Sequence, residues 1–472
     1  MGKRKAASQY KSTDRSGLPT ELFNFFPKQL AACDAADTHE YTFYGGSRGP
    51  GKSYWLRWYC LQFLSVCKAY GKRDVVVGLF CDTYKTLTDR QVSKIATEFP
   101  RSLGEVKDSK THGLGFYLRD GGGVIALRNL DDPSKYQGAE FALIAVDELT
   151  KIKVETFNLL RGSKRWSGIK NTRFIAAGNP GGIGHLWVKD YWIDKVYPPE
   201  MERLRDEFCF VPALPDDNPH LDKSYWQMLD TLPPTLAKAW RYGEWDVFEG
   251  QAFGQWRREK HVIEPIEIPS HWARFRGVDW GRANPFCCLW GAQDPDTGRV
   301  IIYRELYQTG LTDTQQARLI GANTPPSEKV NITYADPSMW TKKAFEDVTF
   351  STADEYRKEG IILTKADNDR LTGKRKVDRM LGDLPDGRPA LQIFSTCANL
   401  LRTLPALPYD TTNAEDVDSE AEDHAYDALR YLLTRVNARP KARVEVVKVD
   451  YAGAAERVLL KRNGAGMGSS DL

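Results

Sequence analysis

A glycine-rich loop between a short apolar run and a helical stretch constrains the fold of this chain most. The segment 46–53 reads GSRGPGKS and has the spacing G-x-x-x-x-G-K-S. The apolar run 41–44 precedes this loop, and the helical pattern 53–64 follows it. Glycines let backbone N–H groups curl around phosphates, and a helix N-terminus adds partial positive charge. The sequence therefore predicts a nucleotide-binding α/β domain.

Individual residues of the loop have predicted roles. Lys52 is expected to neutralise the β- and γ-phosphates of ATP, and Ser53 to ligate Mg²⁺. Arg48 has two interpretations, a charge stabiliser that reaches the γ-phosphate or a solvated arginine, and the sequence leaves both open. The other predicted cofactor-binding residues of the loop are Gly46, Ser47, Gly49 and Gly51.

Two later strand ends complete the predicted nucleotide site. The apolar run 141–146 ends in Asp147 and Glu148. We expect Asp147 to join the metal shell and Glu148 to polarise the attacking water, since the pair lies downstream of a phosphate loop. A strand over 172–178 ends at Asn179, which is either a sensor of the γ-phosphate or a turn residue before proline.

Four aspartates in the second half of the chain are candidate metal ligands. Asp279 and Asp336 each end an apolar strand, so their side chains can meet at one sheet edge. Asp423 and Asp427 lie at i and i+4, on one face of the last helix. Clustered carboxylates repel each other unless cations neutralise them, and two Mg²⁺ or Mn²⁺ ions roughly 3.5–4 Å apart can stabilise phosphodiester hydrolysis. The adjacent His424 is expected to point off that face and to be structural.

Each aspartate also has a purely structural interpretation. Asp279 can start a turn, Asp336 can form an Asx turn before proline, and Asp423 can cap the last helix. Their combination with a phosphate loop favours the functional interpretation. The sequence does not say which of Asp423 and Asp427 carries more of the metal binding.

Strand and helix patterns predict an α/β chain of two domains. Continuous apolar strands alternate with helices from about residue 40 to 245, as in a doubly wound parallel sheet. From residue 274, three strand-like segments with a turn at 294–298 predict an antiparallel meander. At 472 residues the chain exceeds the size of single cores, roughly 250–300 residues. We predict a flexible arm 1–20, a first domain 21–245, a linker 246–269, a second domain 270–439 and a flexible tail 440–472.

Composition excludes several classes. A net charge of +3 is compatible with a nucleic-acid partner without arguing for one. The eight cysteines include no C-x-x-C pair, which fits a reducing compartment and gives no zinc site. The N-terminus lacks the apolar core of a signal peptide, and no apolar run has the length of a membrane span. We therefore expect a soluble, intracellular protein.

In their order and spacing, these motifs resemble those of the phage terminase large subunit, the DNA-packaging motor of tailed viruses. GSRGPGKS and AVDE resemble its Walker A and B elements, and the segment from Ala176 to Trp192 resembles its coupling motif and the sequence after that motif. The segment 242–256 resembles the bridge between its ATPase and nuclease. GVDWG, YADPS and EDHAYDALRY resemble the three acidic motifs of its nuclease. Gln29, in FFPKQ, resembles its adenine-recognising residue.

The resemblance implies a P-loop ATPase of the ASCE type with a parallel-rich sheet, followed by an RNase H-like nuclease with a mixed sheet. ATP hydrolysis would drive double-stranded DNA through the portal into the procapsid, and a two-metal endonuclease would cut concatemeric DNA. The implied cofactors are ATP with Mg²⁺ in the first domain and two ions of Mg²⁺ or Mn²⁺ in the second. The implied partners are DNA, the portal protein and procapsid, a small terminase subunit and further copies in a ring, with no membrane. The implied location is the host cytoplasm and, transiently, the portal vertex.

Some points stay open. Gln137 stands where such proteins often have arginine, so a trans-acting arginine finger is unassigned, with Arg128, Arg161 and Arg165 as weak candidates.

The main alternative function is that of a helicase-nuclease or resolvase of DNA recombination, which the bridge and the last helix disfavour. A second alternative is a DNA-binding switch whose ATP site only drives assembly. Glu148 disfavours this switch, because a site without hydrolysis needs no residue that activates water.

Overall fold

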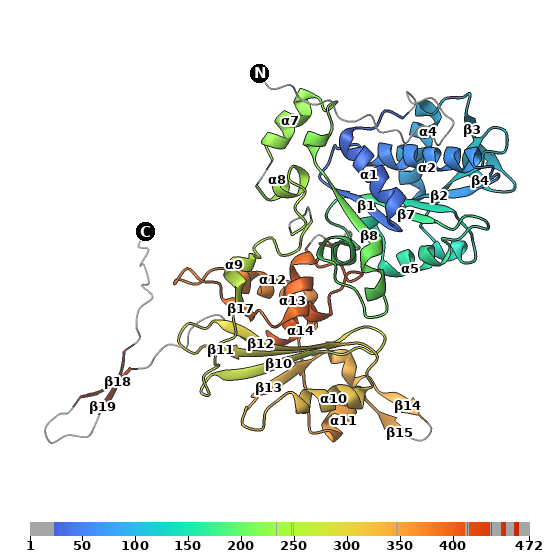
Figure 1. The fold of residues 1–472 in the computed structure, drawn as a ribbon. Coiled ribbons are helices and arrows are strands. Elements are labelled where there is room, and N and C mark those ends of the chain that lie inside the picture. Colours follow the sequence, from blue (N-terminus) through green and yellow to red (C-terminus); the bar gives the residue numbers. More distant parts are fainter. Residues whose placement is uncertain are drawn as a thin grey trace. The chain divides into compact units, whose positions relative to one another are not determined.

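The computed structural model forms two compact units, described here one at a time (Figure 1). It describes residues 23–232, 234–246, 248, 250–345, 348–410, 413, 415–434, 436, 445–449 and 457–461. The first unit is the chain up to Ala252 together with 406–409, and the second is Phe253–Pro405 with the residues from Asp410 on. This division falls inside the segment 246–269. The arm 1–20 lies outside the described residues, and the predicted domain bounds stay a prediction.

The first unit is built on a sheet of eight strands. In spatial order the strands are β3 (Gly104–Ser109), β4 (Gly113–Leu118), β5 (Val124–Asn129), β2 (Val76–Cys81), β6 (Leu143–Val146), β7 (Arg173–Gly178), β1 (Tyr41–Gly46) and β8 (Phe208–Ala213). The strands from β5 to β8 in this order are parallel, and β3 and β4 add an antiparallel edge. The predicted parallel-rich sheet is therefore confirmed.

The order of the parallel strands brings the phosphate loop and the acidic pair to the same edge of the sheet. Strand β1 leads into the phosphate loop and β6 leads into the acidic pair, with β7 between them. Because all three strands are parallel, their carboxyl ends meet at one edge of the sheet, and the residues that follow them can form one site.

Helices cover both faces of this sheet (Figure 1). Helices α1 (Pro27–Thr38) and α2 (Lys52–Ala69) contribute to one hydrophobic cluster, and α5 (Val154–Gly162) contributes to the other. Along β2 the side chains alternate, with Val77 and Leu79 in the first cluster and Phe80 in the second. Burial on both faces explains the continuous apolar strands of the sequence.

Shorter elements complete the first unit. The α-helices are α3 (Tyr84–Leu87), α4 (Ser93–Glu98), α6 (His185–Val188), α7 (Lys223–Asp230) and α8 (Pro234–Trp240). The π-helical segments are η3 (Thr88–Val92) and η6 (Lys189–Asp194), and the 3₁₀ segments are η4 (Pro133–Tyr136), η5 (Leu149–Lys151), η7 (Glu202–Glu207) and η8 (Pro215–Asp217). Among the described helices, none is both long and apolar enough to cross a bilayer.

The second unit is built on a mixed sheet of seven strands. Their order is β16 (Thr364–Lys365), β13 (Ile332–Ala335), β10 (Ala273–Asp279), β11 (Phe286–Gln293), β12 (Val300–Gln308), β17 (Leu391–Phe394) and β9 (Val262–Ile263). Strands β10, β11 and β12 form the predicted antiparallel meander, and β13 lies parallel to β10. Strand β9 lies in the segment predicted as a linker, yet it pairs with β17 in this sheet.

Helices lie on both faces of the second sheet as well (Figure 1). One side carries α12 (Arg370–Leu381), α13 (Ala398–Thr403) and α14 (His424–Leu432), and the other carries α10 (Asp313–Ala322) and α11 (Thr352–Lys358). The remaining elements are α9 (Arg258–His261), η9 (Pro337–Trp340), η10 (Leu404–Ala406) and the pairs β14 (Lys343–Phe345) with β15 (Val348–Phe350) and β18 (Glu445–Val449) with β19 (Arg457–Lys461).

Close packing of α14 on β10 brings the acidic residues of the two elements together. A Cβ atom at Gly277 of β10 would lie 2.0 Å from the carbonyl oxygen of Ala428 and 2.7 Å from Cβ of Leu432, both on α14. Backbone cannot yield at such a distance, so only glycine allows this approach. The glycine of the GVDWG motif is therefore the reason that the start of α14 can lie beside Asp279, which ends β10.

We expect Gly277→Ala to destabilise the second unit, because the added methyl group must push α14 off the sheet. Overpacking of this kind costs about 1–3 kcal/mol in the free energy of unfolding. Urea denaturation of the whole chain measures the change. Gly321→Ala, on α10, is the matched control, since a Cβ atom there meets nothing within 4 Å. Equal stability of the two variants would show that α14 does not pack as described.

Candidate functional site

The phosphate loop has the backbone geometry that its sequence predicts. Strand β1 ends at Gly46 and α2 begins at Lys52. The φ angles of Gly46, Gly49 and Gly51 are +140°, +100° and +79°, in the region that favours glycine. A Cβ atom at Gly46 would also lie 2.6 Å from the carbonyl oxygen of Ala213 on β8. Both conformation and space therefore require glycine at the start of the loop.

Lys52 lies inside the loop, almost fully buried. Its ammonium donates to the carbonyl oxygen of Ser47 and, at 2.8 Å, to Oδ1 of Asn179. Burial lowers the pKa of Lys52 to about 8, although the charges of Glu148 and Asp147 oppose this shift. A phosphate in the loop would supply the negative charge that the buried ammonium lacks.

Ser53 and Asp147 lie side by side at the start of α2 and the end of β6. The hydroxyl of Ser53 donates to Oδ1 of Asp147 at 3.1 Å, and Nε2 of Gln91 donates to Oδ2 at 2.6 Å. Burial, and then the charge of Glu148, raises the pKa of Asp147. Hydroxyl and carboxylate oxygens are the ligands that Mg²⁺ prefers. These two residues could therefore hold the metal of a Mg²⁺-nucleotide.

Glu148 has an unusual backbone conformation and two polar partners. Its φ of +56° lies in the left-handed region, which is uncommon for a residue other than glycine and is found more often at functional sites. Oε1 accepts from NH1 of Arg90 at 2.5 Å, and Oε2 accepts from Nδ2 of Asn179 at 3.5 Å. Asn179 therefore contacts both Lys52 and Glu148, as a residue that senses the γ-phosphate would.

Sequence reasoning missed Arg90 and Gln91. They are consecutive residues of η3, and each contacts one carboxylate of the acidic pair. Arg57 of α2 ties them to the phosphate-loop helix, because its NH1 donates to Oε1 of Gln91 at 3.3 Å. The sequence around them matches no motif. The only available signal was a pair of long polar residues shortly after the buried strand β2.

Three further predicted residues anchor the loop. The guanidinium of Arg48 lies 3.7 Å from the ring centroid of Trp240, which is cation–π contact rather than full solvation. The buried amide of Gln29 donates to the carbonyl oxygen of Gly51 at 3.0 Å and accepts from the backbone of Phe26 at 3.0 Å. The hydroxyl of Ser47 donates to the carbonyl oxygen of Ala213 at 2.8 Å. The adenine and γ-phosphate roles of Gln29 and Arg48 stay predictions.

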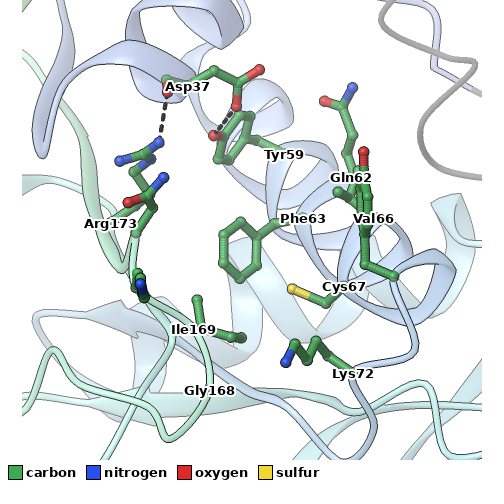
Figure 2. A pocket seen from close by; sticks show the side chains of 13 residues that line it. Asp37, Tyr59, Gln62, Phe63, Val66, Cys67, Lys72, Gly168, Ile169 and Arg173 are labelled. Atoms are coloured by element: carbon green, nitrogen blue, oxygen red, sulfur yellow. Dashed lines mark hydrogen bonds between the residues drawn. The ribbon is translucent and has the colours of Figure 1, made fainter.

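A cavity of about 190 Å³ lies beside the loop, lined by Arg48, Glu148, Asn179 and Trp240 among others. A second cavity, of about 690 Å³, lies elsewhere (Figure 2). It is lined by α2 from Tyr59 onward, including Phe63, by the segment before β7, and by Arg173 at the start of β7. The phosphate loop lies at the opposite end of both elements, so the larger cavity is separate from the nucleotide site.

The segment that resembles the bridge packs against the segment after Asn179. The ring of Trp245 stacks on His185 with centroids 5.5 Å apart, and Phe248 lies 4.5 Å from the same ring. Nδ1 of His185 accepts from the backbone of Gly181 at 3.0 Å. Burial lowers the pKa of His185 to about 3, so this ring is neutral at physiological pH. The bridge-like segment therefore contacts α6, in the segment that follows the predicted sensor Asn179, through stacked rings.

The weak candidates for an arginine finger make local contacts. Arg128 donates to the carbonyl oxygens of His112 and Leu114, and Arg165 pairs with Glu140 at 3.0 Å. Arg161 donates to Oδ1 of Asn158 at 3.3 Å. Any role in a neighbouring subunit stays a prediction.

The second site is centred on Asp279, which is 7% exposed. Nδ1 of His424 lies 3.1 Å from its Oδ2. The expectation that His424 points away from the acidic face is therefore wrong. The helix begins only at His424, so the regular helical spacing used for that expectation does not apply to the residue before it. The hydrogen bond to Asp279 raises the pKa of His424 against the opposing effect of burial.

Asp423 and Asp427 share a cation. Arg370 places NH2 3.2 Å from Oδ2 of Asp423 and NH1 3.5 Å from Oδ2 of Asp427. Arg430 places Nε 3.1 Å from Oδ1 of Asp427. Asp423 stands at the N-cap position of α14, but its side chain makes no capping hydrogen bond. Its carboxylate is turned toward Arg370 instead.

Negative charge accumulates at this site. Burial, and also the charges of Asp427 and Asp336, raises the pKa of Asp279 to about 6, although the bond to His424 opposes this. Burial and the charge of Asp427 raise the pKa of Asp423 to about 7 against the effect of Arg370. Oδ1 of Asp336 accepts from the backbone of Ser338 at 2.8 Å in an Asx turn. The structural interpretation of Asp336 is therefore observed, and its role as a metal ligand stays a prediction.

The chemistry of this donor set fits Mg²⁺ or Mn²⁺, because carboxylate oxygens are hard ligands. Yet within the described part of the chain, no three such side chains are already arranged around a common point. Arg370, Arg430 and His424 contact carboxylate oxygens of Asp279, Asp423 and Asp427. The four predicted ligands are thus brought to one region, and their role in holding a metal stays a prediction.

Comparisons with known proteins agree with the motifs. No protein-family model matches this chain. It is 23% identical over 422 residues to the PBSX phage terminase large subunit of Bacillus subtilis (strain 168), a match that spans 83% of this chain and 90% of that protein. Solved structures of large terminases are also among the proteins to which it is similar. One, from a thermophilic bacteriophage and in complex with ATP-γ-S, has 18% identity over 87% of this chain and 99% of its own, with a TM-score of 0.40. That of bacteriophage HK97 has 11% identity over 88% of this chain and 95% of its own, with a TM-score of 0.45. The resemblance predicted from the motifs is confirmed, because over most of its length this chain is similar to a phage terminase large subunit.

Proposed function

We propose that this protein is the ATPase and nuclease subunit of a viral genome-packaging motor. One observation carries the proposal: a phosphate loop whose Lys52 and Ser53 contact Asn179 and Asp147, and a cluster of buried carboxylates, lie on separate sheets of one chain. ATP hydrolysis in the first unit drives double-stranded DNA through the portal into the procapsid. The second unit cuts concatemeric DNA to start and to end packaging.

The contacts of the first site support ATP hydrolysis. Lys52 neutralises the β- and γ-phosphates, and Ser53 and Asp147 hold Mg²⁺ with the nucleotide. Glu148 accepts a proton from the water that attacks the γ-phosphorus, and the bond between the β–γ bridging oxygen and the γ-phosphorus breaks to leave ADP and phosphate. Asn179, which contacts both Lys52 and Glu148, responds to the loss of the γ-phosphate. Arg48 adds charge at the γ-phosphate, and Gln29 contacts the adenine.

The carboxylates of the second site support phosphodiester hydrolysis. When bound, two divalent ions supply stabilisation of the attacking and leaving oxygens. Asp279, Asp336, Asp423 and Asp427 hold these ions. His424, through its contact with Asp279, orients that carboxylate.

The proposal includes the partners and organisation that such a motor needs. The first unit corresponds to an ATPase domain over 21–245, and the second to a nuclease domain over 270–439. Copies of the chain form a ring on the portal protein, and a small terminase subunit selects the DNA. The protein acts in the host cytoplasm and, during packaging, at the portal vertex of the procapsid.

Packaging of linear DNA into purified empty procapsids tests this function. We expect ATP-dependent protection of the DNA from added nuclease in the presence of the protein. Absence of protection together with strand unwinding or cutting of branched DNA in solution would instead indicate the recombination enzyme. No contact described above favours that alternative.

A further inference from the structure

Arg370 lies among three carboxylates of the second unit. Its Nε is 3.1 Å from Oδ2 of Asp416, its NH2 is 3.2 Å from Asp423, and its NH1 is 3.5 Å from Asp427. Each nitrogen of the guanidinium thus faces a different carboxylate. Arg370 is the first residue of α12, and of the two predicted metal ligands among its partners, Asp423 is the N-cap residue of α14 and Asp427 lies in the first turn of that helix.

The surroundings make these ion pairs stronger than surface ones. The side chain of Arg370 is 29% exposed, and those of its three partners are 10–15% exposed. At such depths, charge interactions are screened less than in water. An arginine side chain is not deprotonated in proteins, so Arg370 keeps its positive charge. The guanidinium supplies the positive charge that neighbouring carboxylates need in the absence of a metal.

Two arginines contact Asp427, but the surroundings of only one of them allow its side chain to move away from this carboxylate. Arg430 is 3% exposed, and its side chain lies against Gly373 so closely that a Cβ atom there would be 2.3 Å from Cδ of Arg430. Arg370 is less buried and has Asp416 and the carbonyl oxygen of Val417 as further acceptors. It can therefore release Asp423 and Asp427 without losing every partner.

We propose that Arg370 is an internal counter-cation that a divalent metal ion must displace from Asp423 and Asp427. Arg370 thereby lowers the affinity of the second site for metal and holds it in a closed arrangement until metal arrives. This inference rests on the proposed metal-dependent nuclease. It identifies a positioning residue for that reaction and a cause for the absence of a ready-made metal cluster among the described residues.

Binding of Mn²⁺ to the full-length chain without DNA tests the proposal, measured by titration calorimetry at constant ionic strength. We expect Arg370→Gln, which removes the charge but keeps hydrogen-bonding groups, to bind Mn²⁺ at least about tenfold more tightly than the native chain. Arg370→Lys keeps the charge and should stay near the native affinity. Arg375→Ala is the matched control, since Arg375 lies on the same helix and pairs at 2.6 Å with the exposed Glu415.

Unchanged or weaker Mn²⁺ binding by Arg370→Gln would overturn the proposal. Loss of DNA cleavage with unchanged Mn²⁺ affinity would also overturn it, and would assign Arg370 to a DNA phosphate instead. Arg370→Ala gives a second charge-free variant, and urea denaturation of each variant reports whether the second unit, which holds Arg370, is folded. Failure of the underlying site is distinguishable, because in that case the native chain and Asp279→Asn would bind Mn²⁺ equally.

Discussion

Glu148→Gln is expected to abolish steady-state ATP turnover while the protein still binds nucleotide. The amide keeps the size of the carboxylate, and its one oxygen can still accept from Arg90 at the position of Oε1, although the contact with Asn179 at Oε2 is lost. It cannot take a proton from the attacking water. General-base catalysis contributes typically 10²–10⁴-fold, and we expect a loss of about that size in kcat. Phosphate release and equilibrium binding of a fluorescent ATP analogue measure the two properties separately.

Glu155→Gln is the control for this experiment. Glu155 is exposed in the first turn of α5, close in sequence to Glu148 and outside the nucleotide site. It should keep native turnover. Native turnover by Glu148→Gln would remove the assignment of Glu148 as the residue that activates water. Loss of nucleotide binding would show instead that the charge of Glu148 maintains the phosphate loop.

Asp279→Asn is expected to abolish Mn²⁺-dependent DNA cleavage and to leave ATP turnover unchanged. The amide cannot supply the negative charge that a divalent ion requires, although it can still bond to His424. Loss of charge stabilisation worth several kcal/mol lowers cleavage by about 10²-fold or more. Conversion of supercoiled plasmid to linear DNA measures cleavage, and the ATPase of the same sample measures the first site.

Asp383→Asn provides the comparison. Asp383 forms an exposed ion pair with Lys260 at 2.7 Å, and such surface pairs contribute little. Its cleavage should match that of the native chain. If Asp279→Asn cleaves as well as Asp383→Asn, the metal site is not where the four aspartates predict it. Parallel loss of ATPase activity would point to misfolding rather than to lost metal.

Local patterns predicted the elements whose chemistry is contiguous in sequence. The phosphate loop needs a strand, glycines and a helix in immediate succession, so segment 41–64 contains its own evidence. The strand ends at Asp147 and Asn179 follow from continuous apolar runs, since a buried parallel strand has no polar face. The meander from β10 to β12 follows from short apolar segments with tight turns between them.

Other parts of the site depend on contacts between distant segments and left no local pattern. Gln91 reaches Asp147 across 56 positions, and Arg370 reaches Asp423 across 53. Nothing in the residues around Arg90 or Arg370 distinguishes them from solvated arginines, because tertiary packing alone chooses their partners. His424 was misassigned for a related reason, since the helical spacing was extended one residue before the helix begins.

The packing of α14 on Gly277 also determines when, during synthesis of the chain, the acidic residues can come together. Asp279 leaves the ribosome long before Asp423 and Asp427 are made, because 143 residues separate the first two along the chain. The sheet of the second unit can begin to form on its own, but its acidic edge stays incomplete until α14 has been synthesised and has packed against β10. The carboxylates of Asp279, Asp423 and Asp427 therefore cannot come together before α14 has been made, and any chemistry that needs all of them is delayed until then.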